Sequence, residues 1–197
     1  MRNRIIPLIA TVLICLNSCT NKSGTTDNHN EIDTLWNDHI QNVFFDVSFG
    51  ANKDEVISKF AKQGFLPIKL ISNDNIIHFN YTEGKFFTFG GMNWEMVRVR
   101  FVNGKFYLID FMNSSEDKAS ALKNFEDVRN VVSKKYLLTD IKHNDTTVYK
   151  TSVGFGKDNR RVGMSCFRYE TVNKQIKIGV DLGYSDDSID NGINEEL

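Results

Sequence analysis

The sequence has no strong excess of either charge. Of its 197 residues, 24 are lysine or arginine and 25 are aspartate or glutamate, which gives a formal net charge of −1. A nucleic-acid-binding protein normally displays a strongly basic face. The near-balance of charge therefore argues against nucleic acid as a partner.

The sequence also lacks the motifs of well-known enzyme classes. It contains neither a glycine-rich phosphate loop nor a G-x-S-x-G elbow. The four histidines are far apart, and none has the spacing of a metal site; they are His29, His39, His78 and His143. We therefore expect no metal and no cofactor, and no motif names a catalytic residue.

No hydrophobic run is long enough to cross a membrane as a helix. The uncharged stretch IIPLIATVLICL has twelve residues and follows Arg2 and Arg4, whereas a spanning helix needs about 20. A charged start followed by a short apolar stretch is typical of a secretory signal peptide.

The end of this stretch, Leu16-Asn17-Ser18-Cys19, resembles the lipobox of bacterial lipoproteins, although Asn17 is an uncommon residue there. The resemblance implies that residues 1–18 are removed and that Cys19 becomes a lipidated N-terminus, which would attach the protein to a membrane. The alternative is an ordinary signal peptide that leaves a soluble secreted protein. Lipidation of Cys19 would leave Cys166 without a disulfide partner, so we expect Cys166 to be a buried core thiol.

Polar segments flank a single predicted domain. The stretch TNKSGTTDNHNEID (20–33) cannot bury enough apolar surface to order itself, and SDDSIDNGINEEL carries five acidic residues. We therefore expect a signal peptide at 1–18, a lipidated cysteine and flexible tether at 19–42, one domain at 43–185, and an acidic disordered tail at 186–197.

Within the domain, hydrophobic periodicity predicts an α+β fold. Residues 43–49 read as a strand, and Asn52 and Glu55 form a capping pattern for a short helix that ends at Gly64. Strand patterns follow as far as Phe111. The segment 114–136 has serine caps and one apolar stripe, formed by Leu122, Phe125, Val128, Val132 and Tyr136. With three more strands, the expected order is β-α-β-β-β-β-α-β-β-β: an antiparallel sheet of about six to eight strands, with two helices packed on one face.

The clearest local signal is the hairpin VRVRFVNGKFYLIDF (97–111). Asn103-Gly104 favours a type I′ turn, which pairs Val102 with Lys105. Strand alternation then predicts an apolar face, formed by Val97, Val99, Phe101, Phe106 and Leu108. The other face would carry Arg98, Arg100, Lys105 and Tyr107. Trp94 lies four residues before Arg98, so it would share this face if the strand extends that far.

A ligand-binding site can be predicted on this second face. Tryptophan, tyrosine and arginine dominate binding hot spots, so we assign the site to Trp94, Arg98, Arg100 and Tyr107. Two alternatives stay open. The face could be an ordinary solvated sheet surface, or helices could cover it while its arginines pair with nearby acids.

Three stretches resemble a group of Bacteroidetes lipoproteins of unknown function: FFDVSFGANKDEVISKFAKQGF, FFTFGGMNWEMVRVRF and the helix ending in VVSKKY. The architecture also resembles small α+β lipoproteins and inhibitors of the β-lactamase-inhibitory-protein and SmpA/OmlA type, which act by binding other proteins. One departure is Leu137, where many such sequences have glycine. The Bacteroidetes resemblance further implies a periplasm-facing outer-membrane protein, because the residues after Cys19 lack the acidic run associated with surface export.

Two function classes follow. The favoured one is a non-enzymatic envelope lipoprotein that binds a protein or glycan partner, or serves as a scaffold. The rival is a small periplasmic hydrolase or polysaccharide-processing accessory protein with a carboxylate-based site. Two close carboxylates in a cleft, or one beside a buried histidine, would favour the rival, whereas a broad aromatic sheet face would favour binding.

Overall fold

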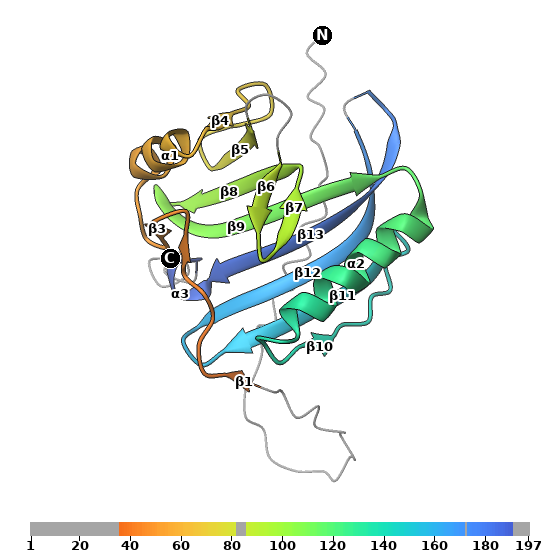
Figure 1. Cartoon of the computed structure of the whole chain (residues 1–197). Coiled ribbons are helices and arrows are strands. Elements are labelled where there is room, and N and C mark those ends of the chain that lie inside the picture. Colours follow the sequence, from red (N-terminus) through yellow and green to blue (C-terminus); the bar gives the residue numbers. More distant parts are fainter. Residues whose placement is uncertain (1–35, 82–85, 172, 191–197) are drawn as a thin grey trace, which may run out of the picture. The chain divides into compact units, whose positions relative to one another are not determined.

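The computed structural model describes residues 36–81, 86–171 and 173–190. Figure 1 shows one curved sheet with helices packed against it. The helices are α1 (Lys53–Lys62), α2 (Lys118–Val132) and α3 (Asp187–Asp190). The strands are β1 (Trp36–Asn37), β2 (Val43–Phe44), β3 (Val47–Ser48), β4 (Phe65–Pro67), β5 (Ile76–Tyr81), β6 (Phe87–Phe89), β7 (Met92–Trp94), β8 (Met96–Val102), β9 (Lys105–Ser115), β10 (Thr139–Asp140), β11 (Val148–Gly156), β12 (Arg160–Glu170) and β13 (Ile176–Asp186).

The main sheet of the described residues has nine strands, in the order β1-β11-β12-β13-β9-β8-β5-β4, with β10 also paired to β11. Because β1 runs parallel to β11, the sheet is mixed. The α+β class is confirmed, but the predicted antiparallel sheet of six to eight strands and its element order are wrong. The difference comes from very short strands, including those of two separate hairpins, β2–β3 and β6–β7. Strands of two or three residues are too short to show an alternating hydrophobic pattern in the sequence.

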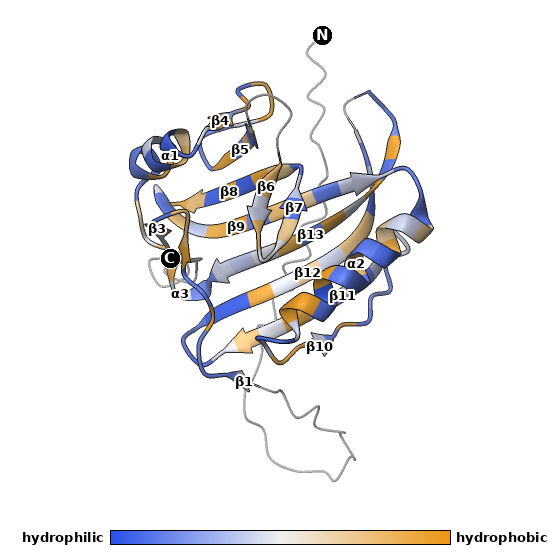
Figure 2. Ribbon diagram, viewed as in Figure 1, coloured by the Kyte–Doolittle hydropathy of each residue, from blue (hydrophilic) through white to orange (hydrophobic). Residues whose placement is uncertain are grey.

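Both longer helices lie on one face of the sheet, here called the helix face. From α1, Phe60 contacts Phe79 of β5, with ring centroids 4.9 Å apart. Phe79 pairs with Val97, which pairs with Phe111, and partners in regular pairing share a face. The longer helix, α2, packs across β9, β12 and β13, and Figure 2 shows its mixture of hydrophilic and hydrophobic residues. The side of the sheet away from these helices is the opposite face.

A side-chain oxygen caps the first turn of each of the two longer helices. The Asn52 side chain accepts a 2.9 Å hydrogen bond from the Glu55 N–H, as predicted. The α2 cap is Asp117, which accepts from the Ser120 N–H at 2.7 Å, so the predicted serine cap is wrong. The predicted stripe of α2 is buried at Phe125, Val128, Val132 and Tyr136, whereas Leu122 is half-buried beside the buried Ala121.

The hairpin turn forms as predicted, but the pairing beyond it shifts. Asn103 and Gly104 both have positive φ, and Val102 pairs with Lys105. A β-bulge then follows, so that Arg100 pairs with Leu108. Because one extra residue reverses the alternation, Leu108 moves to the opposite face, and Ile109 and Phe111 enter the core.

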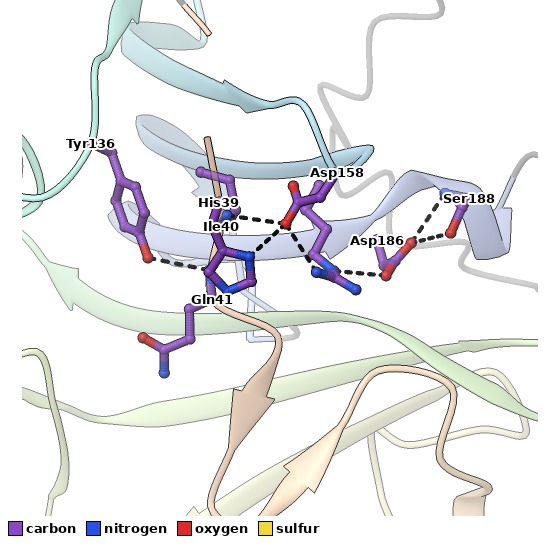
Figure 3. A network of polar contacts seen from close by, with 8 residues as sticks. His39, Ile40, Gln41, Tyr136, Asp158, Asp186 and Ser188 are labelled. Carbon is purple, nitrogen blue, oxygen red and sulfur yellow. Dashed lines mark hydrogen bonds and ion pairs between the residues drawn. The ribbon is translucent and has the colours of Figure 1, made fainter. Parts of the chain in front are cut away.

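The described domain is longer at both ends than predicted. Ile40 is fully buried, and its N–H donates to Asp158, which also pairs with His39 and Arg160 (Figure 3). Residues 36–42 therefore belong to the domain rather than to a tether. At the other end, Asp186 lies in β13 and residues 187–190 form α3, so the predicted tail at 186–197 begins too early. Cys19 and residues 191–197 lie outside the described residues.

Candidate functional site

The predicted exposure of Trp94 is wrong. The chain bends at Glu95, and Trp94 belongs to the separate β6–β7 hairpin rather than to an extension of β8. Its side chain is completely buried. The indole Nε1 donates to the Phe89 carbonyl at 3.1 Å, and the ring lies 5.9 Å from that of Phe111. Trp94 is therefore a core residue on the helix face.

The other three predicted residues do not form one exposed surface either. Arg98 is on the opposite face, but it is only 5% exposed and pairs with Asp110. Arg100 and Tyr107 are half-buried. The prediction failed because strand alternation gives the face of a side chain but not the neighbours that bury it.

Arg98 belongs to a charge cluster on the opposite face, in which Arg98, Asp110 and His78 are buried and Asp181 and Ser165 are half-buried. Its Nε and Nη2 lie 2.8 Å and 2.7 Å from Asp110 Oδ2. On the next strand, Asp181 accepts hydrogen bonds from the Ser165 N–H and hydroxyl at 2.8 Å and 2.6 Å. His78 pairs with Arg98 across β5 and β8. We call Arg98, Asp110, Asp181, Ser165 and His78 the charge cluster.

Pairing explains why the two acids of the cluster are close. Asp110 lies opposite Gly183, and Asp181 is two residues before Gly183 on the same strand, so the acids are diagonal neighbours. Gly183 leaves the space that Asp110 uses, since an added Cβ there would lie 2.6 Å from Asp110 Oδ1. The sequence signal was a single aspartate within each apolar strand, in LIDF and VDLGY. This signal does not show that the two aspartates meet, because the two strands are far apart in the sequence.

Burial shifts two pKa values in this cluster in opposite directions. Burial, together with the charge of Asp110, raises the pKa of Asp181 to about 6. Burial, together with the charge of Arg98, lowers the pKa of His78 to about 4. His78 Nδ1 is buried and makes no hydrogen bond to the described residues.

These shifts predict opposing effects on stability between about pH 4 and pH 6. Because the folded state holds a proton on Asp181 that the unfolded state has lost, the contribution of Asp181 to stability falls as pH rises through this range. The contribution of His78 rises over the same range, because the unfolded state holds the proton instead.

The two contributions can be separated by substitution. We expect the stability of Asp181→Asn, relative to wild type, to increase as pH rises from 4 to 7, and that of His78→Gln to decrease. Urea unfolding at several pH values measures both differences. Differences that do not change with pH would contradict the assigned pKa shifts.

A second candidate site is a pocket between α2 and β11 with a volume of about 630 Å³. Its walls come from α2, β10, β11 and the segment that connects β10 to β11. We call it the α2–β11 pocket; it is lined by Phe125, Glu126, Arg129, Asp140, Ile141, Lys142, His143, Asn144, Val148, Tyr149, Lys150, Thr151 and Ser152. No sequence pattern predicts this pocket, because the segment between Tyr136 and Val148 shows no periodicity.

The polar side chains of this pocket are held in place by one another. Arg129 Nε lies 3.3 Å from both Asp140 Oδ1 and Ser152 Oγ. The Ser152 hydroxyl also donates to Asp140, and these contacts, with the charge of Arg129, hold the pKa of Asp140 below its usual value. Lys150 pairs with Glu126. The pocket therefore offers fixed donors and acceptors of both charges.

The histidines and the cysteine give little evidence for catalysis. Within the described ranges, no group of three or more His, Cys, Asp or Glu side chains could hold a metal ion. His39 pairs with Asp158, and His143 lines the pocket. Cys166 is buried, and burial followed by the charge of Asp181 raises its pKa to about 11. The prediction of a buried core thiol is confirmed.

No family model, curated protein or solved structure matches this chain. Among the described helices, none is long and apolar enough to cross a membrane.

Proposed function

We propose that this protein is a non-enzymatic lipoprotein of a bacterial cell envelope that binds a glycan or protein ligand in the α2–β11 pocket. The observation that supports the proposal is the pocket itself. Its volume of about 630 Å³ falls within the range of about 300–1,000 Å³ that is usual for ligand sites. Its paired charges can donate hydrogen bonds to hydroxyl or carbonyl groups and accept them from hydroxyl or amide groups.

The pocket replaces the surface of Trp94, Arg98, Arg100 and Tyr107 as the proposed binding site. A partly exposed lysine and glutamate, Lys150 and Glu126, lie on its wall. Tyr149 adds an aromatic ring, over which Lys118 Nζ lies 3.9 Å from the ring centroid. Rigid aromatic and planar polar groups bind ligands at a low cost in conformational entropy.

The binding proposal is tested by crosslinking and capture from native membranes with matched variants. Glu126→Gln with Lys150→Gln removes an ion pair from the pocket wall. Lys123→Gln with Asp127→Asn removes a comparable exposed pair elsewhere on α2. Since exposed pairs contribute little to stability, both variants should fold.

We expect the Glu126/Lys150 variant to capture about tenfold less ligand, or even less, and the Lys123/Asp127 variant to match wild type. Captured material is analysed for protein and for carbohydrate. Equal capture by both variants would contradict a role for the α2–β11 pocket.

The proposed location is an outer membrane, facing the periplasm, with the anchor at Cys19. We expect Cys19→Ala to lose the mass of the lipid and to leave the membrane fraction when the membranes are washed at high salt, which removes electrostatic contacts but not a lipid anchor. Intact-mass measurement and fractionation check this, with Cys166→Ala as the control for loss of a cysteine. A Cys19→Ala variant that fractionates and weighs like wild type, apart from the substitution, would contradict the lipoprotein proposal.

A second candidate function is carboxylate-based hydrolysis, as a hydrolase or a polysaccharide-processing accessory protein. One specific observation favours it: Asp110 and Asp181 are close, and the pKa of Asp181 is raised to about 6, which suits a general acid. Hydrolysis of an envelope glycan that is lost in Asp181→Asn but kept in the Glu126/Lys150 variant would favour this candidate over the binding proposal.

A further inference from the structure

The loop between β4 and β5 presents apolar side chains to solvent. Leu70 is 90% exposed, and Ile71 next to it is 38% exposed. Leu66, on the adjoining β4, is 50% exposed. Figure 2 shows this hydrophobic stretch in the loop beside β4 and β5. Single exposed apolar residues are common, but two adjacent ones on a loop with a third on the adjoining strand indicate an interaction surface.

Hydrogen bonds fix the conformation of this loop. The Ile68 carbonyl accepts from the Ser72 N–H at 3.1 Å and from the Ser72 hydroxyl at 2.8 Å. The same hydroxyl oxygen accepts from the His78 N–H at 3.0 Å, which ties the loop to β5. These bonds hold the backbone on both sides of Leu70 and Ile71.

Two lysines lie close to the apolar residues in the sequence. Lys69 directly precedes Leu70, and Lys62 ends α1, just before β4. Neither makes an ion pair with the described residues. Figure 1 shows α1 and the β4–β5 loop at the same end of the sheet. The loop thus combines exposed leucine and isoleucine side chains with the positive charge of Lys69, while the acid of the same loop, Asp74, pairs with Lys53 at 3.3 Å.

We propose that the β4–β5 loop is a membrane-docking element that inserts Leu70 and Ile71 into the interface of an anionic phospholipid bilayer. Lys62 and Lys69 would contact the phosphate groups of the lipids. Apolar side chains flanked by lysine are the composition of interfacial membrane-binding segments. This contact goes beyond the proposed function, because it requires neither the α2–β11 pocket nor the lipid at Cys19.

A bilayer fits the loop better than a protein partner does. A stable protein interface usually buries about 800 Å² and 20–30 residues on each side, whereas the exposed apolar side chains here are Leu70 and Ile71 of the loop and Leu66 of β4. A bilayer requires no matching shape, so a few inserted side chains with nearby lysines can bind it without a large complementary surface.

The test uses the chain from Thr20 onward, which carries no lipid and keeps the whole core described in residues 36–190. A Leu70→Cys variant is labelled with an environment-sensitive fluorophore, because Cys166 is buried. It is mixed with vesicles of phosphatidylcholine, or of phosphatidylcholine and phosphatidylglycerol in equal amounts. We expect a blue shift of the emission on the anionic vesicles and a much smaller shift on the neutral ones.

Sedimentation with the same vesicles tests the residues separately. We expect Leu70→Ser to weaken binding to anionic vesicles about tenfold, and Lys62→Gln with Lys69→Gln to weaken it about tenfold or more. Ile176→Ser is the control, because Ile176 is equally apolar and 61% exposed but lies on β13. All variants should keep the thermal midpoint of wild type, since each changed side chain is exposed.

Two results would overturn the proposal. One is the absence of both the blue shift and sedimentation with anionic vesicles. The other is a loss of binding in Ile176→Ser equal to that in Leu70→Ser. If Leu70→Ser instead loses a crosslinked envelope protein while wild type ignores vesicles, the loop docks a protein and the membrane proposal is wrong.

Discussion

Replacing Asp110 with alanine is expected to lower the free energy of unfolding by about 3–5 kcal/mol. Asp110 and Arg98 are 7% and 5% exposed, and both Nε and Nη2 of Arg98 lie within 2.8 Å of the same carboxylate oxygen. Removal of the carboxylate leaves a buried guanidinium without its main partner. The cost is therefore that of an uncompensated buried charge rather than that of one lost hydrogen bond.

The control for this prediction replaces both members of the pair. Arg98→Met with Asp110→Asn keeps similar volumes and leaves neither charge behind, so we expect a much smaller loss of stability than for Asp110→Ala. Chemical denaturation measures both variants. If Asp110→Ala loses less than about 1 kcal/mol, the pair is hydrated in solution and behaves as a surface ion pair.

Phe125→Ala is expected to cost about 3–5 kcal/mol, because it empties a buried phenylalanine site between α2 and the sheet. Phe125 is 1% exposed, and α2 is the helix that covers β12 and β13. Val131→Ala on the same helix is the control, since Val131 is 37% exposed. Thermal unfolding should separate the two variants clearly. Equal midpoints would mean that α2 does not pack against the sheet.

Local sequence signals predicted the local structure well. Asn103-Gly104 specified the turn because both residues tolerate positive φ. The stripe on α2 specified which side of the helix is buried, because Phe125, Val128 and Val132 recur at the helical period. In both cases the information lies within a few neighbouring residues.

The candidate sites could not be predicted in this way. The bulge beside Phe106 shifts every later pair of β8 and β9, and no residue in the hairpin marks it. Strand alternation places Trp94 on the same face as Arg98 only if one strand joins them, and the chain bends at Glu95, so that Trp94 belongs to a separate hairpin. The charge cluster depends on β13 lying beside β9, although α2 and three strands separate them in the sequence. The pocket depends on an aperiodic segment that folds back onto α2.

The attachment of residues 36–42 has a mechanical consequence. β1 is a two-residue strand on the edge of the sheet. From this strand, the Asn37 side chain donates to the carbonyls of Leu137 and Phe155, both at 3.1 Å, and the Ile40 N–H donates to Asp158 (Figure 3). A pull on the chain before Trp36 loads these few edge contacts one after another, whereas β11, β12 and β13 are joined by long ladders that share a load among many hydrogen bonds. Under tension, residues 36–42 would therefore detach from the edge before the ladders of β11, β12 and β13 open, and the sheet that forms the core would stay folded.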